Sequence, residues 1–175
     1  MDDETSHDGP SQLPPYSYVP GGPWPHPNRA KQAGGARSGE PSRARPLTED
    51  LAASPWFRRA VRLFDAGYYW EAHEAWEALW HAAGRRGATA DVLRGLIKLA
   101  AAGIKVRERR EAGVRTHARR AADCFASARR QGGSHQLGLD LDAWIERALA
   151  IAENPPSDPG PPDAPVTRVF AFRFD

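Results

Sequence analysis

The chain has 175 residues, which is enough to bury a sizeable core in one domain, and its formal charge is only +2. A single cysteine excludes an intramolecular disulfide and favours a reducing compartment. No apolar run approaches the roughly 20 residues that span a bilayer, and the acidic N-terminus lacks the apolar segment of a secretion signal. We therefore expect a soluble cytoplasmic protein without membrane partners.

Residues 1–46 are rich in proline and glycine and show no helical period, which predicts an extended arm. Within it, "LPPYSYVPGGPWPHP" places Tyr16, Tyr18 and Trp24 among prolines. These rings gain from burial, and prolines lower the entropy lost on ordering. We expect the arm to lie on the folded body, although the composition also suits a free tail that presents a proline-rich ligand to a protein partner.

Five helices are predicted in the next part of the chain, residues 47–154. The first has Ser54 as N-cap, Pro55 at its first position and Gly67 as its end. The second covers about 68–83, and the third follows Thr89 as a candidate cap. The fourth covers 112–130, and the fifth, 142–154, has Asp140 or Asp142 as a candidate cap.

The expected fold class is therefore all-α, a compact antiparallel bundle of about five helices, because most connections are short. Residues 155–175 form a separate extended tail in this interpretation. Phe170, Phe172 and Phe174 alternate with small or charged residues, which is strand-like. The "YSYV" segment of the arm is one candidate partner for such a strand.

The second helix carries an unusual arc of ionisable side chains. At 100° per residue, His73, Glu77 and His81 are successive i, i+4 neighbours, with Glu71 and Glu74 beside them. Trp70 projects into the same arc, and a large ring is unfavourable on a face that simply meets water. The arc is therefore predicted to be partly covered.

The third helix is apolar around most of its circumference, except for one stripe that consists of Asp91, Arg94, Lys98 and Lys105. Two of the three lysines of the chain lie there, while arginine dominates elsewhere. If this stripe faces the arc, a semi-buried cluster with shifted pKa values results. We expect Glu74 or Glu77 within salt-bridge reach of Lys98 or Lys105. The alternative is an inter-helix ion-pair seam without chemistry.

A metal centre is not expected from this pattern. "HEAWE" begins like the zinc motif H-E-x-x-H, but Glu77 stands where the second histidine belongs. His73 and Glu77 could still share an ion, yet the lysines expected opposite them would repel a cation. Phosphate-binding loops and nucleophile motifs are absent as well, so the sequence predicts neither a metal nor a cofactor.

The motif "AGYYWEAHEAWEALW", followed by "LRGLIKLAAAG", resembles the domain-of-unknown-function 309 family over residues 56 to 130. The family pattern is G-x-[YF]-[YFW]-E-[AC]-H-E-x-x-E-x-x-W, then G-L-I-[QK]-x-A. The resemblance implies a small helical bundle with the two motif helices together, and it supplies no activity. The matching positions are Gly67, Glu71, His73, Glu74, Glu77, Trp80, Gly95, Leu96, Ile97, Lys98 and Ala100.

The arm also resembles the N-terminal extension of some longer relatives of this family. In those proteins a D-P-x-G-H-S-like segment follows, whereas this chain reads "HPNRAKQAGGARSGEP" and lacks the histidine. Many shorter relatives have Gln at the position of Lys98 and a Tyr-His pair at Ile104 and Lys105. A mechanism that needs a histidine from that helix therefore does not transfer to this chain.

Two functions stay open at this stage, so the sequence alone does not decide whether the protein is an enzyme. The first is a small-molecule site with Glu74 or Glu77 as base, His73 as relay and Lys98 as anion anchor. The second is a non-catalytic module that recruits a protein through its arm or tail. Nucleic-acid binding through the Arg-rich fourth helix is unlikely, since acids dilute the arginines. Further candidate ligand-binding residues are Lys105, Glu71, Trp70, His81 and His26.

Overall fold

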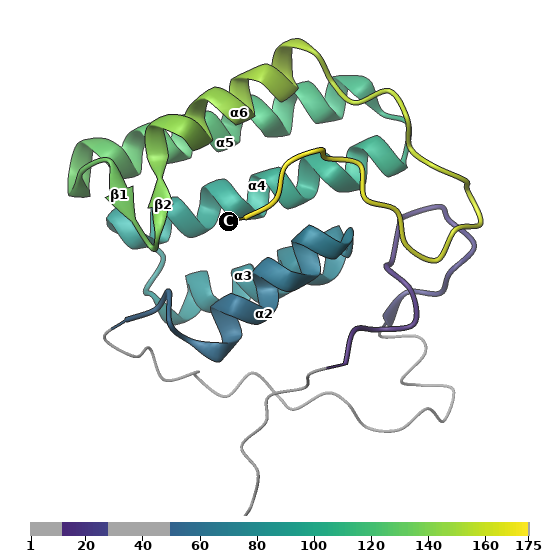
Figure 1. The fold of residues 1–175 in the computed structure, drawn as a ribbon, viewed down its shortest axis with the longest axis horizontal. Helices are drawn as coiled ribbons and strands as arrows, with labels where there is room; N and C mark the ends of the chain where they lie inside the picture. The colour runs from purple at the N-terminus through teal and green to yellow at the C-terminus, as the bar shows by residue number, and fades with distance from the viewer. Residues whose placement is uncertain (1–11, 28–49, 175) are drawn as a thin grey trace, which may run out of the picture.

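The computed structural model of the chain describes residues 12–27 and 50–174. Five helices pack as a bundle in these ranges, so the predicted all-α class is confirmed (Figure 1). They are α2 (Pro55–Ala66), α3 (Tyr69–Ala82), α4 (Ala88–Arg107), α5 (Glu111–Gly132) and α6 (Leu141–Glu153). The predicted boundary between arm and bundle at residue 46, and the rest of the 1–46 arm, lie outside the described residues.

The helix ends follow the capping residues in most cases. Ser54 Oγ accepts from the Trp56 N–H, and Gly67 ends α2 in the left-handed conformation. Asp140 caps α6 by accepting from the Asp142 N–H. The candidate cap Thr89 is wrong, because Gly87 is the N-cap and α4 begins at Ala88. The glycine accommodates the positive φ of 89° at this position without the steric cost that threonine would meet.

Helix α4 is the centre of the bundle. It contacts α3 on one side and α5 on the other, and most of its residues are buried. Two glycines permit this close packing: a Cβ on Gly103 would lie 2.6 Å from the ring of Tyr69, and one on Gly95 would lie 2.5 Å from the ring of Phe125. Any larger side chain would force the neighbouring helix away.

A two-stranded hairpin joins α5 to α6 and was not predicted. Strand β1 (His135–Gln136) pairs antiparallel with β2 (Leu139–Asp140). The two turn residues, Leu137 and Gly138, both have positive φ, as in the turn types that favour tight hairpins. Strands of two residues carry too little periodicity to be recognised in a sequence.

The C-terminal segment crosses the front of the bundle between α2 and α6 (Figure 1). Phe170 is buried, and its ring stacks on Phe64 with the centroids 5.7 Å apart. The Val169 and Phe170 N–H groups both donate to the Tyr69 hydroxyl, at 2.9 and 3.3 Å. At the other end of the segment, Arg107 donates to the Ala164 carbonyl. The tail is therefore part of the core.

The expected strand in this tail is not formed in the described residues. The backbone donors that a strand partner would have paired are taken instead by the Tyr69 hydroxyl and, at Phe174, by the Asp65 carboxylate at 3.0 Å. The "YSYV" segment contributes only one backbone hydrogen bond to it, from the Ser17 N–H to the Pro165 carbonyl at 2.8 Å. The burial of its phenylalanine rings, and not strand pairing, therefore determines the conformation of the tail.

No helix in the described ranges combines the length and apolar character that crossing a bilayer requires.

The glycine contact between α3 and α4 generates a prediction. Gly103→Ala should lower the free energy of unfolding by about 1–3 kcal/mol, since the new methyl group overlaps the fixed ring of Tyr69. Chemical denaturation of both proteins measures this loss. Gly113→Ala is the control, because its methyl group would meet only the flexible Lys105 side chain, at 3.0 Å, and alanine favours helix by about 1 kcal/mol. Equal stabilities for Gly103→Ala and the parent would contradict the close approach.

Candidate functional site

Three ionisable groups of α3 come together on one face of the helix. The side-chain ligand atoms of His73, Glu74 and Glu77 all lie within 4.8 Å of one another. The three differ in environment: the Glu74 side chain is 58% exposed, the His73 side chain is 27% exposed, and Glu77 is half-buried. Glu77 has no hydrogen bond or ion pair within the described ranges. The predicted partial cover of the arc therefore applies to His73 and Glu77, while Glu74 is exposed.

His73 is held in the neutral form. Burial is the main cause that lowers the pKa of its imidazole; the carboxylates of Glu77 and Glu74 oppose this shift, and the Lys98 ammonium adds to it. A neutral ring has a lone pair that accepts a proton. Of the predicted α4 stripe, Lys98 therefore lies close enough to the arc on α3 to act on His73.

The predicted salt bridge between the two helices is wrong within the described residues. Lys105 pairs with Glu108 on its own helix, and Lys98 has neither a hydrogen bond nor an ion pair. The local i, i+3 pair forms because Glu108 is the nearer acid and its side chain is only 6% exposed. Lys98 is left near His73 as an unpaired positive charge.

Asp91 and Arg94, the other charged residues of the α4 stripe, serve packing. Asp91 is 6% exposed and accepts hydrogen bonds from Ser127 and Gln131 of α5, both at 2.7 Å, besides its pair with Arg94. Burial alone would raise the pKa of this carboxyl, but the hydrogen bonds outweigh it and the pKa is lowered. Asp91 and Arg94, two of the four residues of the predicted stripe, thus belong to a polar contact between α4 and α5.

Glu71 anchors the arm. Its carboxylate accepts from the Ser17 hydroxyl at 2.7 Å and from the Tyr18 N–H at 3.0 Å. Burial raises the pKa of Glu71, although the bonds from Tyr18 and Ser17 oppose the shift. The predicted docking of the arm on the bundle is confirmed for residues 12–27, with Glu71 as an attachment point and not as a ligand contact.

Trp70 links the arm to the ionisable arc. Tyr18 and His26 pack edge-on against its ring, with centroids 4.7 and 5.5 Å away. On its other side, Trp70 stacks on His73 with the centroids 6.4 Å apart. The predicted cover over the arc is therefore the arm, and His26 lies at the edge of the site. His81 does not join it, because its exposed ring packs on Trp80.

His117 of α5 belongs to the same face, and sequence reasoning assigned it no role. Burial and the charges of Lys98, Lys105, Arg120 and His73 lower its pKa to about 4. The signal that could have found it is the 3–4 residue spacing of polar positions on α5, next to a buried alanine stripe. We call the surface formed by His73, Glu74, Glu77, Lys98 and His117 the polar face.

Two cavities lined by described residues open elsewhere. One, of about 500 Å³, lies between the α3–α4 loop and the β1–β2 turn. The other, of about 200 Å³, lies between the arm and residues 159–162. Neither is lined by a residue of the polar face.

Comparison with known proteins gives one match. Residues 57–117 fit the family model described as Domain of unknown function (DUF309), which confirms the predicted family over α2, α3, α4 and the first part of α5. The match ends at His117, so it contains every member of the polar face. No curated protein and no solved structure matches the chain.

Removal of the arm is predicted to loosen the start of α3. Deletion of residues 1–27 strands the Glu71 carboxylate and uncovers Trp70, so amide hydrogen exchange at 68–81 should accelerate. The loss of stability should be about 1–3 kcal/mol, since hydrogen bonds to a charged group are removed. Tyr16→Phe is the control, because the Tyr16 hydroxyl donates within the arm, to the Pro25 carbonyl. Unchanged exchange and stability after deletion would mean that the arm contributes nothing to α3.

The absence of a tightly bound metal stays a prediction. His73, Glu74 and Glu77 are close enough to share one ion, but Lys98 lies beside them as an unpaired cation. Elemental analysis of protein purified without chelator should show well below one equivalent of zinc, iron or manganese. A stoichiometric metal that Glu77→Gln removes would contradict this expectation and reassign the cluster.

Proposed function

This chain carries a domain of the DUF309 family, and we propose that this domain binds a small anionic molecule on the polar face and exchanges a proton with it. The observation that supports the proposal is the trio of His73, Glu74 and Glu77, with ligand atoms within 4.8 Å of one another and an unpaired lysine nearby. A base, a relay and an anion anchor are the elements that proton transfer to or from a bound molecule requires.

Glu77 is the better candidate for the base. It is half-buried and unpaired, while Glu74 is 58% exposed, so water solvates the Glu74 carboxylate more fully. Glu77 also raises the pKa of His73 more strongly than Glu74 does. In the proposed step, Glu77 takes a proton from the ligand and the electron pair stays on the ligand.

Lys98 then stabilises the negative charge that develops on the ligand. It lies on α4, across from His73, and has no carboxylate partner that would neutralise it. Neutral His73, whose ligand atom lies within 4.8 Å of that of Glu77, then passes the proton on to water. The arm limits the access of solvent at the Trp70 edge, where Tyr18 and His26 pack.

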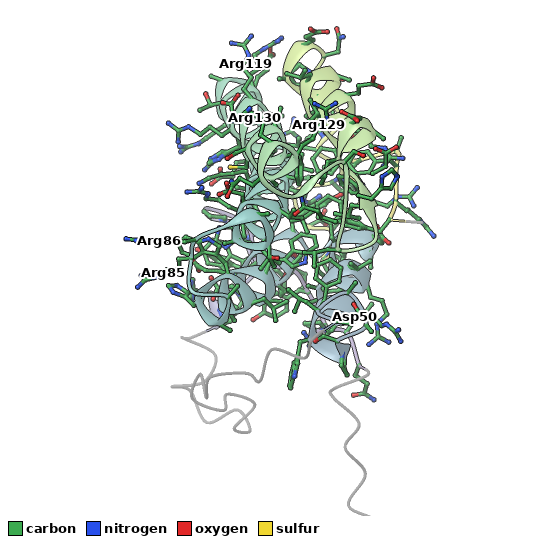
Figure 2. The ribbon with its side chains drawn as sticks, turned by 90° about the vertical axis from the view of Figure 1, so that its left-hand side faces the viewer. Asp50, Arg85, Arg86, Arg119, Arg129 and Arg130 are labelled. Atoms are coloured by element: carbon green, nitrogen blue, oxygen red, sulfur yellow. The ribbon has the colours of Figure 1, made fainter. Side chains whose placement is uncertain are left out.

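The alternative interaction module has less support. Phe170 is buried, and Phe172 and Phe174 pack against the core, so these rings do not offer a free recruiting surface. The arginines of α5 lie partly in ion pairs: Arg129 contacts Asp142 at 2.6 Å and Arg115 contacts Glu111 at 2.8 Å. Arg119 and Arg130 point outward, as expected for a solvated face (Figure 2).

Deuterium exchange tests the proposal. The full chain is incubated in D₂O with a panel of small 2-oxo acids and phosphorylated ketones, and loss of the acidic C–H signal is followed by proton NMR. Exchange above the buffer rate is expected for at least one compound. Glu77→Gln should slow it by about 10²–10⁴-fold, the usual contribution of a positioned base.

Asp123→Asn is the matched control, because it removes one exposed carboxylate of α5 outside the cluster. It should leave the exchange rate unchanged. Exchange at the buffer rate for the whole panel, or a rate that Glu77→Gln and His73→Gln do not alter, would reject proton transfer at this face.

A further inference from the structure

Two members of the polar face on α4 and α5, and Arg120 beside them, contain groups that lack partners. Within residues 12–27 and 50–174, Lys98 and Arg120 have no hydrogen bond or ion pair. The third is His117, whose Nδ1 atom is buried and has no hydrogen-bond partner. Buried polar atoms are nearly always paired in folded proteins, so an orphan indicates a missing partner or a functional constraint.

Because Nδ1 of His117 is buried, the other ring nitrogen, Nε2, is the one that can contact a ligand. A proton on the buried Nδ1 would strand a donor, so the neutral ring carries its proton on Nε2. The ring is half-buried, which leaves Nε2 as the nitrogen that reaches the surface. His117 therefore presents an N–H donor at the surface; Arg120 follows it by three residues on α5, and Lys98 of α4 is close enough to help lower its pKa.

Lys105 lies near His117, but it does not offer an unpaired charge to a ligand. Its aliphatic chain lies over Gly113, where an added Cβ would be 3.0 Å from Lys105 Cδ, one helical turn before His117. Its ammonium is held by Glu108, so its charge is locally balanced. The unbalanced positive charge at His117 comes from Lys98 and Arg120.

We propose that Lys98, Arg120 and His117 Nε2 form a subsite for the carboxylate or phosphate group of a small ligand. Two unpaired cations and one neutral donor, contributed by two helices, satisfy the charge and the lone pairs of such a group. The proposal rests on the proposed function of the polar face and names the ligand class: the anionic group lies between α4 and α5, and the reacting part points towards Glu77 on α3.

A bound anion should change the titration of His117 in a defined direction. Burial, together with the positive charges of Lys98, Lys105 and Arg120, lowers its pKa to about 4, and Glu108 compensates only Lys105. An anion beside Nε2 favours the protonated ring, so it should raise the pKa of His117 by about one or more. Imidazole NMR titrations of the full chain with phosphate, with acetate and with chloride at equal ionic strength measure this effect. The two oxyanions are compared to separate phosphate from carboxylate preference.

Two variants and one matched control locate the site. Lys98→Met and Arg120→Met should each weaken the better oxyanion by about tenfold or more, because each removes a charge-assisted contact. Arg119→Met removes the same charge from the adjacent residue, which is exposed and lies on the outside of the molecule at the top of the view in Figure 2, and should bind like the parent. Amide spectra of each variant confirm that the fold is retained.

The proposal is overturned if chloride raises the pKa as much as the oxyanions do, or if neither raises it. It is also overturned if Arg119→Met weakens binding as much as Arg120→Met. Glu77→Gln separates this inference from the proposed function: oxyanion binding that persists in this variant, together with deuterium exchange at the buffer rate in the parent, supports the subsite and rejects only proton transfer.

Discussion

The close approach of α4 to its two neighbours is the constraint on which the rest of the molecule depends. Gly103 receives the ring of Tyr69 from α3, and Gly95 receives the ring of Phe125 from α5. Because α4 contacts both α3 and α5, charged side chains from the three helices come near one another, as the mutual electrostatic effects of His73, Lys98 and His117 indicate. The same Tyr69 presents its hydroxyl to the backbone of the C-terminal segment, so one ring positions both the polar face and the tail on the opposite side.

Charge on the polar face is divided between helices in a way that packing alone does not require. The unpaired carboxylate of Glu77 stands on α3, and the unpaired cations Lys98 and Arg120 stand on α4 and α5. Both imidazoles, His73 and His117, are kept neutral by burial and by nearby positive charge. A neutral imidazole carries one N–H donor and one lone pair, so both rings can form hydrogen bonds without adding charge to the polar face.

Much of this arrangement was predictable from the sequence, and the failures have physical reasons. Helical periodicity and caps such as Ser54 gave the five helices, because local propensity and burial agree there. The facing of α3 and α4 followed from two complementary stripes. The predicted salt bridge failed because Lys105 found a nearer acid, Glu108, one turn away. His117 escaped notice because its role depends on charges from other helices, which no local pattern records.

An ion-pair seam and a reactive site differ in whether their charged side chains are paired across the boundary between helices. A seam satisfies its charges across the helix boundary, as Asp91 does with Ser127 and Gln131 of α5. The ion pairs that α4 forms with other described residues stay within that helix, and Glu77, Lys98 and Arg120 have none in the described ranges. Unpaired charges at a half-buried surface cost free energy unless something completes them. A ligand with an anionic group and a transferable proton would complement both sides, which is why the polar face fits a site better than a seam.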